Sequence, residues 1–203
     1  PDLCGGAEGM LATAEQAALH GVTVVQLRAP NWKKRQWLAT AKQLKALLAP
    51  LNVPLIINDH IDIALAVDAD GVHVGQQDFP VLEARRLLGP NKIIGLSTNH
   101  LAQFQEAEAM YRAGIIDYVG VGPVYPTGTK KDAAPVLASA EVTAMMQNRI
   151  MPSVAIGGIQ AGKVAPLIAQ GLHGVAVVSA ICGQSDVAAA TKALRAEIQQ
   201  ARL

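Results

Sequence analysis

Short apolar runs of strand length alternate with Ala- and Leu-rich stretches of helical period, and this alternation constrains the fold more than any other feature. The runs are apolar at successive positions, as buried parallel strands are when helices cover both faces of a sheet. They lie at 22–28, 54–58, 71–74, 93–96, 117–121, 153–156 and 174–178. The helical stretches lie at 8–20, 31–49, 61–68, 80–88, 100–113, 139–149, 162–170 and 185–203. The pattern predicts repeated βαβ units in an α/β protein.

Polar residues and glycines follow nearly every predicted strand, which favours a closed barrel over an open sheet. An open sheet binds its ligand at one switch point, whereas a barrel gathers the ends of all its strands at one mouth. These residues are Gln26, Arg28, Asn58, Asp59, Gly75 to Asp78, Ser97, Gly120, Gly122, Gly157, Gly158 and Ser179. We therefore predict a (β/α)8 TIM barrel.

The predicted strands number one fewer than a closed barrel needs. The first helical stretch, 8–20, has no strand before it, so we expect the first strand to lie before Pro1 and the run at 22–28 to flank a gap. The chain has 203 residues with no linker, charge block or change in composition. We therefore expect a single TIM-barrel domain over 1–203.

Composition excludes several classes of function. Hydrophobic residues make up 51% of the chain and charged residues 16%, so it is not disordered. A net charge of +1 and 3% aromatic residues argue against a nucleic-acid partner. We find no run of membrane-spanning length and no signal peptide, so we expect no membrane partner and a cytoplasmic location. Cys4 and Cys182 lie far apart outside any metal-binding motif, and we expect reduced, packed thiols.

Two carboxylates follow neighbouring predicted strands. Asp59, preceded by Asn58, ends the run at 54–58, and Asp78 comes just beyond the run at 71–74. Adjacent barrel strands bring such ends together, and a pair of carboxylates suits Mg²⁺, which usually adds substrate phosphates to one or two protein carboxylates. The alternative that these residues alone leave open is that each aspartate caps the helix that follows it.

Three segments could bind anions at the same mouth. The loop GPVYPTGTKKD at 122–132 offers backbone amides, hydroxyls and two lysines, although such a loop can simply be a solvated surface. Gly157 and Gly158, then Val178 and Ser179, follow the last two strands, where barrels often bind phosphate on backbone N–H groups. Gly157 and Gly158 could instead serve only a tight turn.

Taken together, these motifs resemble the thiamine-phosphate synthase family. They are QLR at 26–28, IIND at 56–59, ADGVHVGQQD at 69–78, GLST at 95–98, DYVGVGPVYPTGTKKD at 117–132, AIGGI at 155–159 and GVAVVSAI at 174–181. They follow the family's order from about residue 8 to the end. The resemblance implies a transferase that joins aminopyrimidine-methyl diphosphate to thiazole phosphate, giving thiamine phosphate and diphosphate.

The resemblance also implies a role for each site residue. Mg²⁺ would be held by Asp59 and Asp78, and the diphosphate would be contacted by Arg28, Asn58 and Lys130. Gln26 and Ser97 would face the pyrimidine, and Thr127 and Thr129 the anionic groups above the site. The thiazole phosphate would bind backbone donors of Gly158, Val178 and Ser179. By this resemblance the catalytic residues are Arg28, Ser97 and Lys130.

Two departures from the family pattern keep other functions open. Pro30 stands where the family has a lysine, and Ala138 where it usually has a glycine. The alternatives are a thiazole tautomerase-like enzyme, against which the intact TGTK segment argues, and a non-catalytic homologue that binds thiamine precursors. No predicted strand contains a lysine for Schiff-base chemistry, and the five histidines show no triad spacing, so we expect most of them to be structural or superficial. Homo-oligomer formation stays open.

Overall fold

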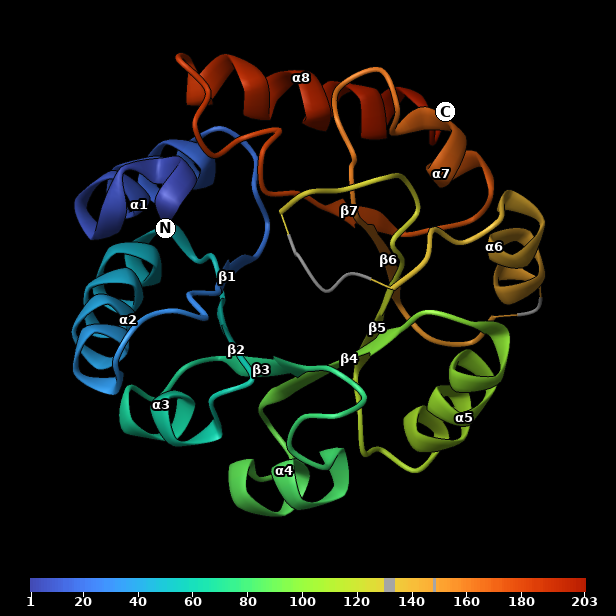
Figure 1. Ribbon diagram of the computed structural model, residues 1–203, viewed down its shortest axis with the longest axis horizontal. Helices are drawn as coiled ribbons and strands as arrows, with labels where there is room; N and C mark the ends of the chain where they lie inside the picture. Colours follow the sequence, from blue (N-terminus) through green and yellow to red (C-terminus); the bar gives the residue numbers. More distant parts are fainter. Residues whose placement is uncertain (130–133, 148) are drawn as a thin grey trace.

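The computed structural model describes residues 1–129, 134–147 and 149–203, and within these ranges the chain forms seven parallel strands. The strands are β1 (Val25–Leu27), β2 (Leu55–Asn58), β3 (Gly71–Val74), β4 (Ile93–Thr98), β5 (Tyr118–Val121), β6 (Ser153–Ile156) and β7 (Gly174–Ala176). They pair in sequence order, β1 to β7, and curl into an incomplete ring (Figure 1). The predicted α/β barrel is confirmed, and each predicted apolar run overlaps one strand.

Helices surround the ring of strands on its outer side (Figure 1). They are α1 (Gly6–Leu19), α2 (Lys34–Leu48), α3 (Ile61–Ala66), α4 (Val81–Leu88), α5 (Leu101–Arg112), α6 (Ser139–Met146), α7 (Ala165–Ala169) and α8 (Val187–Gln200), with short 3-10 helices η1 (Asp2–Cys4) and η2 (Ala49–Leu51). No helix in the described ranges is both long and apolar enough to cross a membrane.

The expected gap in the barrel lies between β7 and β1. In the described part of the chain no ladder joins these two strands, and β1 pairs only with β2. The run predicted at 22–28 forms only three residues of strand, because a partner on one side alone leaves its first residues without a ladder. Val24 is accordingly 48% exposed.

Helix α7 is shorter than the predicted stretch at 162–170. Gly162 has a φ of +84°, which is outside the right-handed helical region. The carboxylate of Glu197 on α8 accepts hydrogen bonds from the backbone N–H groups of Gly162, Val164 and Ala165, at 2.8 to 2.9 Å. A side chain from another helix thus replaces the turn that would have extended α7.

The strands have two different faces. Leu55, Ile57 and Val72 belong to the main hydrophobic cluster between the sheet and the helices. Residues at alternating positions, such as Ile56 and His73, are also buried but lie outside that cluster, on the inner face of the barrel. The inner face is therefore the one that carries polar side chains toward the strand ends.

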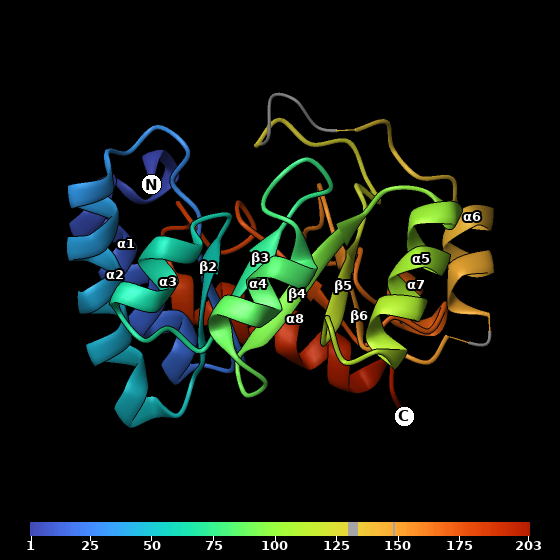
Figure 2. The same ribbon diagram turned by 90° about the horizontal axis from the view of Figure 1, so that it is seen from below.

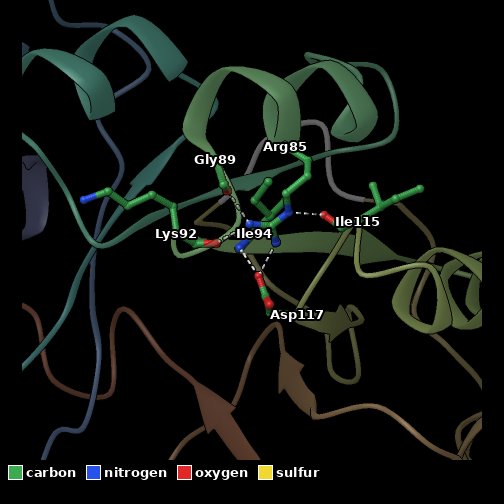
Figure 3. Close-up of polar contacts among 6 residues, drawn as sticks. All are labelled: Arg85, Gly89, Lys92, Ile94, Ile115 and Asp117. Atoms are coloured by element: carbon green, nitrogen blue, oxygen red, sulfur yellow. Dashed lines mark hydrogen bonds and ion pairs between the residues drawn. The ribbon is translucent and has the colours of Figure 1, made fainter.

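At the base of the barrel, Arg85 of α4 contacts the segments where β4 and β5 begin (Figure 3). Its guanidinium donates to three backbone carbonyl oxygens, those of Ile115, Gly89 and Lys92, and pairs with Asp117 Oδ2 at 2.7 Å. The same carboxylate oxygen accepts from the backbone N–H of Ile94 at 2.7 Å. One ion pair thus joins the starts of two strands to a helix end.

Both cysteines are free, as predicted. The sequence places them at opposite ends of the chain, but the fold brings Cys4 within hydrogen-bond reach of the Cys182 thiol, and burial raises the pKa of Cys182. They pack where η1 meets the segment that follows β7.

Candidate functional site at the mouth of the barrel

The predicted site residues gather where the parallel strands end. Figure 2 shows the loops after β3 and β5 rising on the same side of the sheet. Gln26 lies on β1 and is exposed, and Arg28 follows this strand and is half-buried. Among the described residues Arg28 has no ion-pair partner. The mouth therefore contains a cation that is available to an anionic ligand.

Asp59 is held at the end of β2 by its backbone. Its φ of +60° is rare for a residue other than glycine, and Asp and Asn tolerate this conformation best. Its N–H donates to the carbonyl oxygen of His73 at 2.9 Å, which fixes it beside β3. The side-chain amide of Asn58 donates to Asp59 Oδ2 at 2.6 Å. Asn58 therefore orients the carboxylate that follows it.

Asp78 stands in the turn after β3. Its Oδ2 accepts from the N–H of Gly75 at 2.9 Å, and a Cβ on Gly75 would lie 2.6 Å from that oxygen. Asp78 is exposed, and its charge acts on both His60 and His73, which lie on either side of the Asp59 segment. Asp59 and Asp78 thus follow the neighbouring strands β2 and β3 at the mouth of the barrel.

The capping alternative for these aspartates is wrong. Helix α3 has His60 as its N-cap and α4 has Pro80, and neither has a side-chain cap hydrogen bond. In the ranges described, no three His, Cys, Asp or Glu side chains form a metal-binding group. Two hard carboxylates without further protein ligands fit Mg²⁺, since this ion takes its remaining oxygens from water and substrate phosphate.

A buried polar network lies beneath Ser97. The His73 ring is 2.9 Å from the Tyr118 hydroxyl through Nδ1 and 2.9 Å from Ser97 Oγ through Nε2. Burial lowers the pKa of His73 to about 4, despite the opposing charge of Asp78. Burial also raises the pKa of Tyr118, so the imidazole and the phenol are both neutral near pH 7. No spacing of these residues in the sequence indicates this network.

The loops after β5 and β6 pack against each other. Val124 and Tyr125 donate backbone hydrogen bonds to the carbonyl oxygens of Ile156 and Gly157, at 2.9 and 3.1 Å. Gly158 has a φ of +63°, and a Cβ there would lie 2.3 Å from the carbonyl oxygen of Pro126. Only glycine fits this contact, so its role extends beyond a tight turn.

The remaining predicted loop residues lie on the same side of the barrel. Thr127 Oγ1 accepts from the N–H of Thr129 at 3.3 Å, in the segment that leads away from the Gly158 contact. Lys130 lies outside the described residues. Ala138, the second departure from the family pattern, is the N-cap of α6.

Val178 and Ser179 begin a tight turn after β7. The carbonyl oxygen of Val178 accepts from the N–H groups of Ile181 and Cys182, at 3.0 and 2.7 Å. Ser179 Oγ accepts from Gln160 Nε2 at 2.8 Å, which ties this turn to the loop after β6. Sequence reasoning missed Gln160, because a lone glutamine in a loop carries no pattern.

Of the basic residues at 33–35, which follow Pro30, Lys34 is the one with polar side-chain contacts among the described residues. Its Nζ lies 2.8 Å from Asp62 Oδ1 and 2.9 Å from His60 Nδ1. It therefore reaches the loop after β2, next to Asp59, but is already paired there. Lys33 and Arg35 are exposed.

The curled parallel sheet with helices outside and converging polar groups at the strand ends defines a TIM-barrel protein with its candidate site at the mouth. The fold is shared with a 3-hexulose-6-phosphate synthase of known structure, at a TM-score of 0.71 and 21% identity over 95% of this chain and 94% of the other. At that identity the likeness concerns the fold alone.

Closer relatives define the family. The sequence model described as thiamine monophosphate synthase matches residues 2–181. Thiamine-phosphate synthases of Laribacter hongkongensis and Xanthobacter autotrophicus are 50% and 47% identical over 97% of this chain, covering 90% and 91% of their own lengths. The thiamine phosphate pyrophosphorylase of Pyrococcus furiosus superposes with a TM-score of 0.84 and 34% identity, covering 94% of this chain and 90% of that one. The chain belongs to the thiamine-phosphate synthase family, a family of transferases.

Proposed function

We propose that the chain joins aminopyrimidine-methyl diphosphate to thiazole phosphate at the barrel mouth and releases diphosphate. The observation that carries this assignment of the site is the pair Asp59 and Asp78, which follow neighbouring strands without capping a helix. A chain that only bound thiamine precursors would not need two such carboxylates beside an arginine that has no ion-pair partner in the described ranges. The substrates are small phosphorylated molecules, and the proposal includes a cytoplasmic location.

The reaction breaks one bond and forms another at the same methylene carbon. The C–O bond to the diphosphate breaks, and its electron pair leaves with the diphosphate. The thiazole nitrogen then gives its lone pair to the methylene carbon. No covalent enzyme intermediate is needed, so the protein has to stabilise a departing polyanion and hold the two rings together.

Residues of β1 to β3 would receive the diphosphate. Arg28 and Asn58 would donate to its oxygens, and Lys130 would add a second cation. Asp59 and Asp78 would hold Mg²⁺, which when bound offsets negative charge on the leaving group. The hydrogen bond from Asn58 to Asp59 supports this role, because it fixes the carboxylate before any ligand arrives.

The remaining site residues would hold the aminopyrimidine and the thiazole phosphate. Gln26 and Ser97 would contact the aminopyrimidine. Backbone N–H groups of Gly158, Val178 and Ser179 would bind the thiazole phosphate, as the loops after the last two barrel strands often do. Thr127 and Thr129 would cover the anionic groups from above. The contact of Gly158 with Pro126 supports this role, since it couples the covering loop to the phosphate loop.

One assay separates this function from its alternatives. The protein is incubated with both substrates and Mg²⁺, and thiamine phosphate and diphosphate are quantified. We expect both products in equal amounts, and no product after the metal is removed with EDTA. Isomerised thiazole phosphate without coupling would identify a tautomerase, and binding without any product would identify a non-catalytic homologue. Full activity in EDTA would overturn the metal role of Asp59 and Asp78.

A further inference from the structure

Three inner-face side chains from neighbouring strands form one chain of hydrogen bonds. His73 of β3 pairs in register with Gly95 of β4, and Gly95 pairs with Tyr118 of β5. Because Gly95 has no side chain, the imidazole and the phenol meet across it, with Nδ1 and the hydroxyl 2.9 Å apart. The other ring nitrogen, Nε2, lies 2.9 Å from Ser97 Oγ.

Glycines on the neighbouring strands leave room for the side chains of this hydrogen-bonded network. A Cβ on Gly95 would lie 2.2 Å from Tyr118 Cζ and 2.5 Å from His73 Nδ1. A Cβ on Gly120 would lie 3.3 Å from His73 Cε1. His73 itself is 7% exposed, whereas Ser97 is half-buried. The network therefore begins in the closed interior of the barrel and ends at a hydroxyl that the mouth can reach.

The chemistry of the two hydroxyl groups decides the direction of the hydrogen bonds. A neutral imidazole has one donor nitrogen and one acceptor nitrogen. A phenol is a better donor and a poorer acceptor than an aliphatic hydroxyl. The favoured arrangement therefore has Tyr118 donating to Nδ1 and the Nε2–H of His73 donating to Ser97 Oγ. In this arrangement the Ser97 proton has no partner within the network and can point into the mouth.

We propose that His73 and Tyr118 are positioning residues that turn the Ser97 hydroxyl into a hydrogen-bond donor toward a ring nitrogen of the aminopyrimidine. The inference rests on the contact of Ser97 with the pyrimidine in the proposed function. It adds a specificity: with its proton aimed at the substrate, Ser97 selects a heterocycle that presents an acceptor at that point. The opposite direction of the network would make Ser97 an acceptor.

Two measurements test the proposal. Nitrogen NMR of ¹⁵N-histidine-labelled protein reports which ring nitrogen of His73 carries the proton, and we expect Nε2. Steady-state kinetics and calorimetry then compare Tyr118→Phe with Tyr111→Phe, which removes a phenol on the outer helix α5. We expect Tyr118→Phe to weaken aminopyrimidine diphosphate binding about tenfold, with thiazole phosphate binding unchanged, and Tyr111→Phe to alter neither.

A double-mutant cycle distinguishes positioning from general packing. In a Ser97→Ala background Tyr118→Phe should have no further effect on aminopyrimidine affinity. His73→Gln, whose amide can still donate to Ser97, should retain more affinity than His73→Leu. A proton on Nδ1 of His73, or additive losses in the cycle, would overturn the inference.

Failure of the underlying site assignment would look different. If Ser97→Ala itself left aminopyrimidine affinity unchanged, the proposed contact of Ser97 would be wrong, and the positioning role would fall with it. If the protein bound the aminopyrimidine as expected but made no thiamine phosphate, the proposed function would fail. The tautomer and the binding cycle would in that case still decide the inference.

Discussion

The site residues Arg28 and Asp78 at the mouth of the barrel differ in their partners from the charged residues at its base. At the base, where strands begin, charges are paired: Arg85 with Asp117, Lys45 with Asp70 and Lys92 with Asp68, at 2.7, 2.7 and 2.5 Å. At the mouth, where strands end, Arg28 has no ion-pair partner in the part of the chain that the structure describes. Asp78 accepts from the backbone N–H of Gly75 and pairs with no cation among the described residues.

The difference indicates that charged residues at the base serve stability and that those of the site at the mouth serve activity. A charge that is already paired at the base gains nothing from a ligand, and breaking the pair costs folding free energy. A charged side chain at the mouth loses solvation free energy when a ligand covers it. The opposite charge of the ligand offsets that loss. Substitutions at the base should therefore change stability with little effect on turnover, and those at the mouth should do the reverse.

The largest expected effect is on activity, and it should distinguish Asp59→Asn from Asp68→Asn, two substitutions at aspartates with the same backbone conformation. Asp59 at the mouth and Asp68 at the base have φ values of 60° and 50°. Asn tolerates this region, so Asp→Asn removes the charge without straining the backbone. Asp59→Asn should lower kcat/KM by about 10²–10³-fold, comparable to the loss of one preorganised electrostatic group, and should weaken Mg²⁺-diphosphate binding while leaving thiazole phosphate binding intact.

Asp68→Asn is the matched control, and it should keep wild-type kinetics because its ion pair is exposed and weak. Calorimetry and steady-state rates measure both variants. Equal activity in the two variants would contradict the proposal that the aspartate at the mouth serves activity and the one at the base does not.

The next effect concerns the backbone of the phosphate loop. Gly158→Ala places a Cβ 2.3 Å from the carbonyl oxygen of Pro126, so the loops after β5 and β6 must move apart. We expect kcat/KM for thiazole phosphate to fall by up to about 10²-fold, the effect of a displacement of about 1 Å. Gly162→Ala has the same kind of positive φ, +84°, but no atom within 4 Å. It should lose stability slightly and keep its affinity for thiazole phosphate.

The corresponding change at the base is Arg85→Leu. It removes the ion-pair partner of Asp117 and the donor to three backbone carbonyl oxygens, which should cost about 1–3 kcal/mol of unfolding free energy. Urea denaturation measures this loss, and kcat below the unfolding transition should stay close to wild type. A large fall in kcat of the folded variant would show that the base also serves catalysis.

A smaller gain is expected from Pro30→Lys. The substitution returns a cation to the segment after β1, so it should raise kcat severalfold if the missing charge slows the departure of diphosphate. The alternative is rescue by a neighbouring base, in which case Ala replacement of Lys33, Lys34 or Arg35 should abolish activity. Because Lys34 is already paired with Asp62, we expect the gain from Pro30→Lys. Unchanged kcat in all four variants would exclude this segment from the site.

The smallest effect is the pH dependence of stability at the base. Burial opposes ionisation of Asp70, but hydrogen bonds from Lys45 and the Leu55 N–H outweigh it and hold the pKa of Asp70 below its usual 3.8. A folded pKa below the unfolded value stabilises the protein above pH 3.8, and this contribution is lost as pH falls through the folded pKa. Asp70→Asn should cost less than about 1 kcal/mol near neutral pH, since the pair is about one-third exposed. Its unfolding free energy should also fall less steeply in acid than that of wild type.

Local pattern was enough to predict the strands, the gap and most of the mouth. Each apolar run overlapped a strand because burial on both faces requires apolar residues at every position, and this requirement is visible along the chain. Helix ends were less predictable. The stretch at 162–170 shortened because Glu197, far along the chain, takes the backbone donors of Gly162, Val164 and Ala165.

The sequence by itself determined the α/β barrel, the family and the placement of Asn58, Asp59, Ser97 and Gly158 at strand ends, because these depend on short-range order and spacing. Only the tertiary structure decided that Asp59 and Asp78 do not cap helices and that His73 lies between Tyr118 and Ser97. The second result depends on the register of β3, β4 and β5, whose paired residues His73, Gly95 and Tyr118 are 22 and 23 positions apart in the chain. Register is set by packing of the whole sheet, and a single sequence does not reveal which side chains it brings together.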